Sequence, residues 1–213
     1  MNSIETGFIT PDQIIDPEQF DAMPKISFIG PPSSGKGTAS ELVKSRYNFA
    51  HTTFSRGIRD HLEYLHGIPQ PHSRELLKPT GIQMVEKFGP LVNLRNAMKY
   101  LMYDLSQDPQ IQGFAIDGFR WPQEGEAISQ LKNSVIVWVE SDQEVRKQRL
   151  LERARPGDLT ENDFYETDNM EIEWTNPLKQ FASATITNNG DLAALESQVK
   201  SLIEARFNLE PLY

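Results

Sequence analysis

The chain has 213 residues, of which 38% are hydrophobic, and a formal net charge of -9 at pH 7. This length supports one substantial core, in a single domain or a domain with insertions, and the acidic balance argues against a broad nucleic-acid-binding surface. Because the chain contains no cysteine, disulfides, cysteine zinc sites and thiol nucleophiles are excluded.

A polar N-terminal extension occupies residues 1–24, which include several acidic residues and no long apolar run. It lacks the basic and apolar regions of a signal peptide. No stretch of the chain approaches the roughly 18 apolar residues that a membrane-spanning helix needs. We therefore expect a cytoplasmic protein without membrane contacts, whose extension either packs on the domain or stays loose.

The strongest motif is Gly-Pro-Pro-Ser-Ser-Gly-Lys-Gly-Thr at residues 30–38. It follows an apolar run, residues 26–29, that predicts a buried strand, and it leads into residues 38–44, which predict a helix. The pattern G-x-x-x-x-G-K is that of a P-loop, whose backbone N–H groups and lysine surround a phosphate. An ordinary strand-to-helix turn is the less favoured alternative. We expect nucleotide contacts from Gly30, Pro31, Pro32, Ser33, Ser34, Gly35, Lys36, Gly37 and Thr38.

A long, mainly helical segment follows a predicted second strand at residues 48–53. The apolar side chains of its last helix recur at helical spacing, which predicts a core-facing stripe: Leu94, Met98, Leu101, Met102 and Leu105. We assign residues 54–108 as a helical insertion between the second and third strands. Such an insertion is a suitable place for an acceptor-binding subdomain.

A third apolar strand, residues 114–116, ends in Asp117-Gly118. In a P-loop protein, an acid at the carboxyl end of a strand lies beside the phosphates and their metal ion. We therefore predict Thr38 and Asp117 as ligands of Mg²⁺, directly or through water. The alternative is that Asp117 simply initiates a turn.

Four arginines mark the segment after the fourth predicted strand, residues 135–139. A helix predicted for residues 142–153 carries three of them on one face, and the fourth lies just beyond: Arg146, Arg149, Arg153 and Arg155. Like charges at this spacing disfavour an isolated helix unless a negative group lies nearby. That group is either a polyphosphate or acidic side chains such as Asp168.

The last strand and helix are predicted at residues 184–187 and 192–206. Five strands then alternate with helices, which predicts a three-layer α/β P-loop NTPase fold with a five-stranded parallel sheet. Ligands in such a fold bind at the carboxyl ends of the strands. We place the whole P-loop domain at residues 25–213.

Three motifs resemble those of adenylate kinases and other nucleoside monophosphate kinases. The P-loop form Gly-x-Pro-x-x-Gly-Lys-Gly-Thr is theirs, although Ser33 stands where adenylate kinases usually have glycine. Asp117-Gly118-Phe119-Arg120 is similar to their Asp-Gly-Phe-Pro-Arg motif without its proline, a form closer to archaeal kinase-like relatives, with dephospho-CoA kinase among the wider kin. Arg153-x-Arg155-Pro-Gly-Asp resembles the arginine-rich edge of their lid, here residues 154–173.

This resemblance implies ATP-dependent phosphoryl transfer to a nucleoside or deoxynucleoside monophosphate, with ATP and Mg²⁺ as cofactors. It implies that Lys36 and the P-loop bind the donor phosphates, and that the loop after the last strand contacts adenine, here through Asn189. The remaining roles fall to arginines: Arg149, Arg153, Arg155 and Arg120 at the transferring group, and Arg59 and Arg120 at the acceptor. The alternatives are a dephospho-CoA kinase-like enzyme acting on another small acceptor, or a nucleotide-binding regulator or ATPase. The sequence leaves the acceptor's identity and the oligomeric state open.

Overall fold

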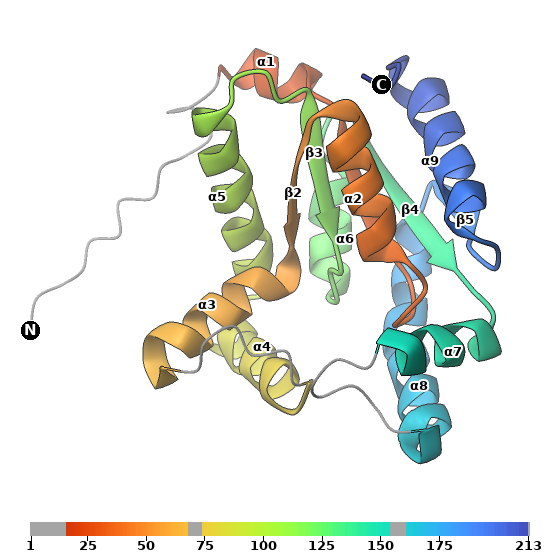
Figure 1. Cartoon of the computed structure of the whole chain (residues 1–213). Helices are drawn as coiled ribbons and strands as arrows, with labels where there is room; N and C mark the ends of the chain where they lie inside the picture. The colour runs from red at the N-terminus through yellow and green to blue at the C-terminus, as the bar shows by residue number, and fades with distance from the viewer. Residues whose placement is uncertain (1–15, 68–73, 154–160, 213) are drawn as a thin grey trace, which may run out of the picture.

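The computed structural model describes residues 16–67, 74–153 and 161–212, which fold around one parallel sheet (Figure 1). The sheet order is β2-β3-β1-β4-β5, and all four neighbouring pairs run parallel. Its strands are β1 (Lys25–Ile29), β2 (Phe49–Thr53), β3 (Gly113–Asp117), β4 (Ser134–Glu140) and β5 (Ala184–Thr187). The predicted five-stranded α/β fold is confirmed.

The interior strand β4 shows that the sheet is covered on both faces. Val135, Val137 and Val139 pack into one hydrophobic cluster, and Ile136 and Trp138 pack into the other. Successive side chains of a strand point to opposite faces, so a nearly unbroken apolar run fits a strand with two covered faces.

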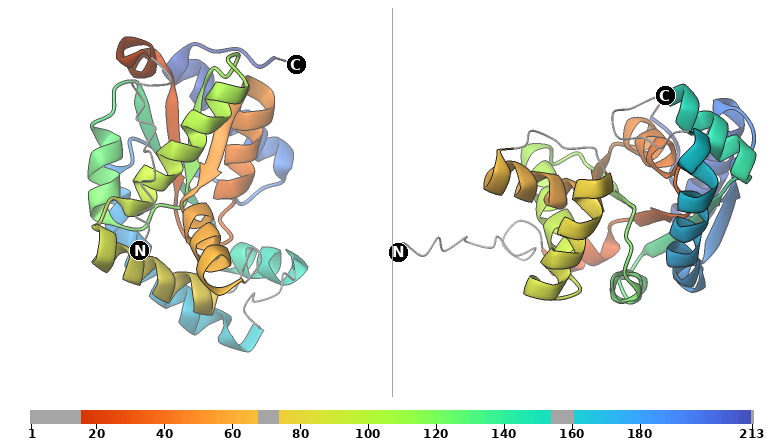
Figure 2. Two further views of the ribbon diagram at one scale, coloured as in Figure 1. Left: turned by 90° about the vertical axis from the view of Figure 1, so that its left-hand side faces the viewer. Right: turned by 90° about the horizontal axis from the view of Figure 1, so that it is seen from below.

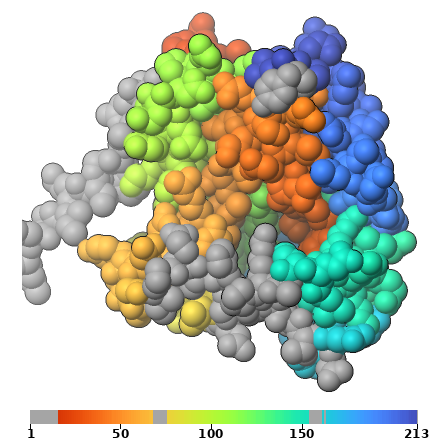
Figure 3. All heavy atoms as spheres, viewed as in Figure 1, coloured from red at the N-terminus to blue at the C-terminus, as the bar shows by residue number. Residues whose placement is uncertain are grey.

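Helices form a layer on each face of the sheet. On one face, α2 (Lys36–Tyr47) packs beside α9 (Leu192–Phe207), and the two helices adjoin in the space-filling view (Figure 3). The other face is covered by α5 (Val92–Gln107), α6 (Pro122–Ser129) and a 3₁₀ helix (Asn176–Phe181). The fold therefore has three layers.

Two helical arms extend beyond the carboxyl ends of the strands. One contains α3 (Phe54–His66) and α4 (Arg74–Phe88), between β2 and β3. The other contains α7 (Gln143–Arg153) and α8 (Glu161–Thr175). Seen from below, α3 and α4 lie on one side of the molecule and α7 and α8 on the other (Figure 2). The predicted stripe on α5 is core: four of its residues are buried, and Met98 packs against them.

Three elements among the described residues were not predicted: α1 (Pro17–Ala22), α6 and the 3₁₀ helix. Helix α1 packs on the domain, because the rings of Phe20 and Phe114 lie 5.8 Å apart. The ammonium of Lys25 also donates hydrogen bonds to the carbonyls of Met23 (2.8 Å) and Lys132 (3.1 Å). The described end of the N-terminal extension is thus held against the sheet. Within the described ranges, no helix is both long and apolar enough to span a membrane.

Candidate functional site

The P-loop joins β1 to α2 through three residues with positive φ: Gly30 (144°), Ser33 (57°) and Gly35 (99°). A Cβ added to Gly30 would lie 2.2 Å from the carbonyl oxygen of Val139, and one on Gly35 would lie 2.1 Å from Nδ2 of Asn188. Both positions therefore require glycine for conformation and for space. The loop leads directly into the N-terminus of α2, an arrangement that suits a phosphate group.

Ser33 is the strained member of this loop, because a residue with a Cβ in the left-handed region costs about 1–2 kcal/mol. We expect Ser33→Gly to raise the free energy of unfolding by about 1 kcal/mol, a rise in Tm of about 2–4 °C for a chain of this size. Thermal unfolding followed by circular dichroism measures the change. Ser33→Ala is the matched control: it also removes the hydroxyl but keeps the Cβ, so a similar gain from this variant would contradict the strain argument.

The loop after β5 supports the P-loop from behind. Nδ2 of Asn188 donates to the carbonyl of Ser34 at 2.8 Å, and the Arg149 guanidinium donates to the carbonyls of Asn188 (2.8 Å) and Gly190 (3.0 Å). The amide oxygen of Asn189 accepts from the backbone N–H of Asp142, at the start of α7. Arg149, predicted at the transferring group, and Asn189, predicted as an adenine contact, thus have structural partners here.

Asp117 ends β3 beside the P-loop, since a Cβ on Gly37 would lie 3.7 Å from its Oδ2. The Thr38 hydroxyl is one residue further along α2, and hydroxyl and carboxylate oxygens are ligands that Mg²⁺ accepts. The described residues contain no group of three or more acidic or histidine side chains that could hold a metal alone. Phosphate and water would supply the remaining ligands, so these two residues fit Mg²⁺ bound together with a nucleotide.

His51 is a neighbour of Asp117 that the sequence interpretation missed. Its Nε2 lies 3.2 Å from Oδ2 of Asp117, and its Nδ1 lies 3.6 Å from a carboxylate oxygen of Glu41. The register explains the contact, because β2 pairs with β3 and places His51 near the end of the adjacent strand. The imidazole thus holds the Asp117 carboxylate in place.

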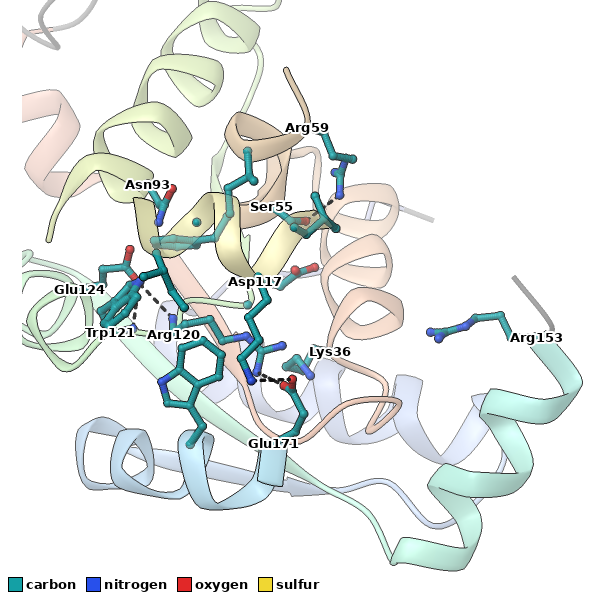
Figure 4. A pocket seen from close by; sticks show the side chains of 18 residues that line it. Lys36, Ser55, Arg59, Asn93, Asp117, Arg120, Trp121, Glu124, Arg153 and Glu171 are labelled. Carbon is teal, nitrogen blue, oxygen red and sulfur yellow. Dashed lines mark hydrogen bonds and ion pairs between the residues drawn. The ribbon is translucent and has the colours of Figure 1, made fainter. Parts of the chain in front are cut away.

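A cavity of about 320 Å³ opens at this edge of the sheet, between the two helical arms (Figure 4). Its size is that of a small-molecule site. Five of the predicted site residues line it: Lys36, Arg59, Asp117, Arg120 and Arg153. Arg149 is not among the described residues that line the cavity. Arg155 lies outside the described residues, as does the first part of the predicted lid, residues 154–160.

Glu171 of α8 pairs with two cations that line the cavity. Its carboxylate lies 3.5 Å from the Arg120 guanidinium and 4.0 Å from the Lys78 ammonium. Arg59 is fixed separately, by donating to the hydroxyls of Ser55 (2.7 Å) and Thr53 (3.3 Å). The sequence interpretation missed Glu171 and Lys78, because they belong to different helices and no motif contains them.

Glu124 is a buried carboxyl at the inner end of the cavity. Its Oε2 accepts the backbone N–H groups of Arg120 (3.0 Å) and Trp121 (3.1 Å), which fixes the start of α6. Burial raises the pKa of Glu124 from 4.5 to about 7, although these two hydrogen bonds and the nearby Asn93 side chain oppose the rise.

This raised pKa makes Glu124 a source of pH dependence. A folded-state pKa above the unfolded value means that the folded state favours the protonated carboxyl. The contribution of Glu124 to the free energy of unfolding is therefore full below pH 4.5 and is lost as the pH rises through about 7. The loss is at most about 3 kcal/mol. We expect Glu124→Gln to remove this pH-dependent loss of stability, because glutamine does not ionise but can keep the hydrogen bonds at the N-terminus of α6.

Urea unfolding of the wild type and Glu124→Gln at pH 5 and pH 8 tests this prediction. The variant should gain stability relative to the wild type at pH 8 and much less at pH 5. Glu126→Gln, on the same helix, is the control and should show no such difference. An equal effect of Glu124→Gln at both pH values would contradict the shifted pKa.

A protein family described as "AAA domain" matches residues 29–163, which include the P-loop, Asp117 and α7. The chain belongs to this family. Among curated relatives of this AAA-domain chain, the adenylate kinase of Flavobacterium johnsoniae is 28% identical over 140 residues, covering 62% of this chain and 68% of the relative. The adenylate kinase of Desulforapulum autotrophicum is 26% identical over 159 residues, covering 71% of this chain and 65% of the relative. The predicted resemblance to adenylate kinase-like P-loop kinases is confirmed, and the chain spans about two thirds of these relatives.

Solved structures of shikimate kinases share the fold of the AAA-domain chain. The enzyme from Bacteroides thetaiotaomicron has a TM-score of 0.54 and 14% identity, with 86% of this chain and 98% of that chain covered. The enzyme from Acinetobacter baumannii, in complex with shikimate, has a TM-score of 0.53 and 18% identity, with 88% of this chain and 95% of that chain covered. At these identities the similarity establishes the P-loop kinase fold alone.

Proposed function

We propose that the protein is an ATP-dependent kinase that transfers the γ-phosphoryl group to a nucleoside or deoxynucleoside monophosphate. The single observation that carries this proposal is the cavity, which Lys36 and Asp117 at the P-loop line together with Arg59, Arg120 and Arg153. A donor phosphate bound at the P-loop would therefore face a second, cationic subsite. The adenylate kinase relatives favour a monophosphate as the acceptor.

The proposed reaction needs positioning and charge neutralisation more than covalent chemistry from the protein. The backbone of residues 30–38 and Lys36 hold the β- and γ-phosphates of ATP. Arg59 and Arg120 hold the acceptor phosphate, one oxygen of which forms the new bond to the γ-phosphorus as the bond to ADP breaks. Arg153 lies at the end of α7 and neutralises charge on the transferring group. Mg²⁺ at Thr38 and Asp117 would supply further neutralisation.

Glu171 affects how the acceptor binds, because it is paired with Arg120 and Lys78. An anionic acceptor that reaches these cations competes with this carboxylate. The proposal therefore includes a movement of Glu171, or of the α8 segment that carries it, when the acceptor enters. This competition favours a dianionic phosphate over a singly charged group.

A panel assay of ADP formation tests the proposed function. The protein is incubated with ATP and Mg²⁺ and with one added acceptor: each common nucleoside or deoxynucleoside monophosphate, dephospho-CoA, shikimate or none. ADP formation that depends on a monophosphate, with the diphosphate recovered, supports the proposal. Dependence on dephospho-CoA or shikimate would replace the acceptor, and nucleotide binding without acceptor-dependent turnover would favour a regulator or ATPase.

A further inference from the structure

Two tryptophans form an aromatic end of the cavity, away from the P-loop. Trp121, at the start of α6, and Trp174, on α8, are partly exposed, and their ring centroids lie 5.8 Å apart with an interplanar angle of 84°. Ile58, Leu77 and Ile82 of α3 and α4 add apolar surface to the same cavity. Figure 4 shows the labelled Trp121 beside Glu124 and Arg120. Large, partly exposed aromatic rings in a cavity are typical of a surface that contacts the flat face of a ligand.

Two buried polar oxygens belong to residues lining the same cavity. Asn93 is 4% exposed and Glu124 is fully buried. Among the described residues, neither Oδ1 of Asn93 nor Oε1 of Glu124 has a hydrogen-bond partner, although the Asn93 side chain lies near enough to the carboxyl to lower its pKa. Buried polar atoms are nearly always paired, and leaving one unpaired costs about 1–3 kcal/mol. Above about pH 7, where the Glu124 carboxyl is ionised, both atoms accept hydrogen bonds, so they call for a ligand that donates.

We propose that the acceptor carries a planar aromatic ring with an amino group, which packs against Trp121 and Trp174 and donates a hydrogen bond to Asn93 or Glu124. This inference rests on the proposed function and specifies its acceptor: a monophosphate of an amino-bearing nucleobase. The apolar and aromatic lining disfavours a ring carrying several hydroxyls, which would leave polar groups unpaired. A base that presents only carbonyl oxygens and one ring N–H places further acceptors against these two oxygens.

Tryptophan fluorescence tests the ring contact without any turnover. The chain has three tryptophans, and the third, Trp138, is buried in the core at 4% exposure. Adding AMP or CMP without ATP should change the emission, whereas ribose 5-phosphate, which has the phosphate but no base, should not. Trp121→Phe and Trp174→Phe should each reduce this change, and Trp138→Phe should retain it. An equal change with ribose 5-phosphate, or a change that disappears only in Trp138→Phe, would overturn the proposal.

Acceptor preference tests the hydrogen bond. In the assay of ADP formation, kcat/KM for the best of AMP, CMP and GMP should exceed that for UMP by about tenfold or more. Glu124→Gln keeps an oxygen for the backbone N–H groups but turns the unpaired position into a donor. Asn93→Leu, of similar volume, removes the other unpaired oxygen. Each of these two variants should reduce the preference by changing the KM of the acceptor, and each should leave the KM of ATP unchanged.

The outcomes separate the two proposals. If no monophosphate is phosphorylated, the proposed function fails, and the fluorescence arm still decides whether a base binds at the tryptophans. If monophosphates are phosphorylated with an equal or greater preference for UMP, only the present inference fails. An unchanged preference in both Glu124→Gln and Asn93→Leu would give these residues a purely structural role and would also overturn it.

Discussion

Replacing Lys36 with alanine is expected to lower kcat for phosphoryl transfer by at least about 100-fold, the size of effect seen when one preorganised electrostatic donor is removed. Lys36 begins α2, lines the cavity and donates a hydrogen bond from its ammonium to the carbonyl of Pro31 at 2.7 Å. The charge is therefore held over the P-loop, where the outer phosphates of ATP would bind. Steady-state ADP formation with saturating acceptor measures the loss.

The side chain is only half-buried and contributes no apolar surface to the core, so the fold should survive the Lys36→Ala substitution. Circular dichroism and the urea unfolding midpoint check this. Lys44→Ala is the matched control on the same helix, because Lys44 is exposed and pairs only loosely with Glu41, at 3.6 Å. Full activity in Lys36→Ala, or an equal loss in Lys44→Ala, would refute the placement of the donor site.

The P-loop and the sheet could be predicted because their signals are local. The loop motif lies within residues 30–38, and each strand is a short apolar run between turns. Helix α6 was missed for the opposite reason. It has 8 residues, and its start is fixed by Glu124, whose role depends on burial beneath other elements. Local patterns contain no information on such burial.

The arginines of α7 show how far a helical pattern can predict a site. Their spacing correctly places them near one face, but three different partners surround that face. Arg146 pairs with Asp168, Arg149 binds the loop after β5, and Arg153 lines the cavity. Which partner each arginine meets depends on how α8 and that loop pack, so sequence spacing alone left the choice open.

The aromatic end of the cavity could not be predicted from any motif. Trp121 follows β3 and Trp174 lies near the end of α8, so the two rings meet only in the folded chain. The same holds for Asn93 on α5 and Glu124 on α6. A sequence motif identified the phosphate end because a P-loop is a continuous segment, whereas the acceptor end is assembled from five separate helices, α3, α4, α5, α6 and α8.

Replacing Arg146 with methionine is expected to lower the free energy of unfolding by about 3–5 kcal/mol, because it leaves a buried carboxylate without its partner. Arg146 and Asp168 are 2% and 1% exposed. The guanidinium donates to both carboxylate oxygens, at 2.8 Å for Nη2 to Oδ2, and also to the carbonyl of Ser141 at 3.0 Å. For a chain of this size, the expected fall in Tm is about 10 °C.

Two controls separate the cost of an uncompensated charge from the loss of a contact. The double variant Arg146→Met, Asp168→Leu removes both charges and should recover much of the stability lost in the single variant. Lys147→Met, one residue along α7, breaks a pair with Glu161, whose side chain is 66% exposed, and should change the unfolding midpoint little. A single variant as stable as Lys147→Met would contradict the cost assigned to the buried charge.

The same substitution should also affect the cavity, because the Arg146–Asp168 pair joins the helix that ends in Arg153 to the helix that carries Glu171 and Trp174. If α8 is held in place mainly by this pair, Arg146→Met should raise the KM of the acceptor at temperatures well below its Tm. The KM of ATP should change less, because the P-loop is supported independently by Asn188. Equal increases in both KM values would show that the substitution loosens the whole domain and not α8 in particular.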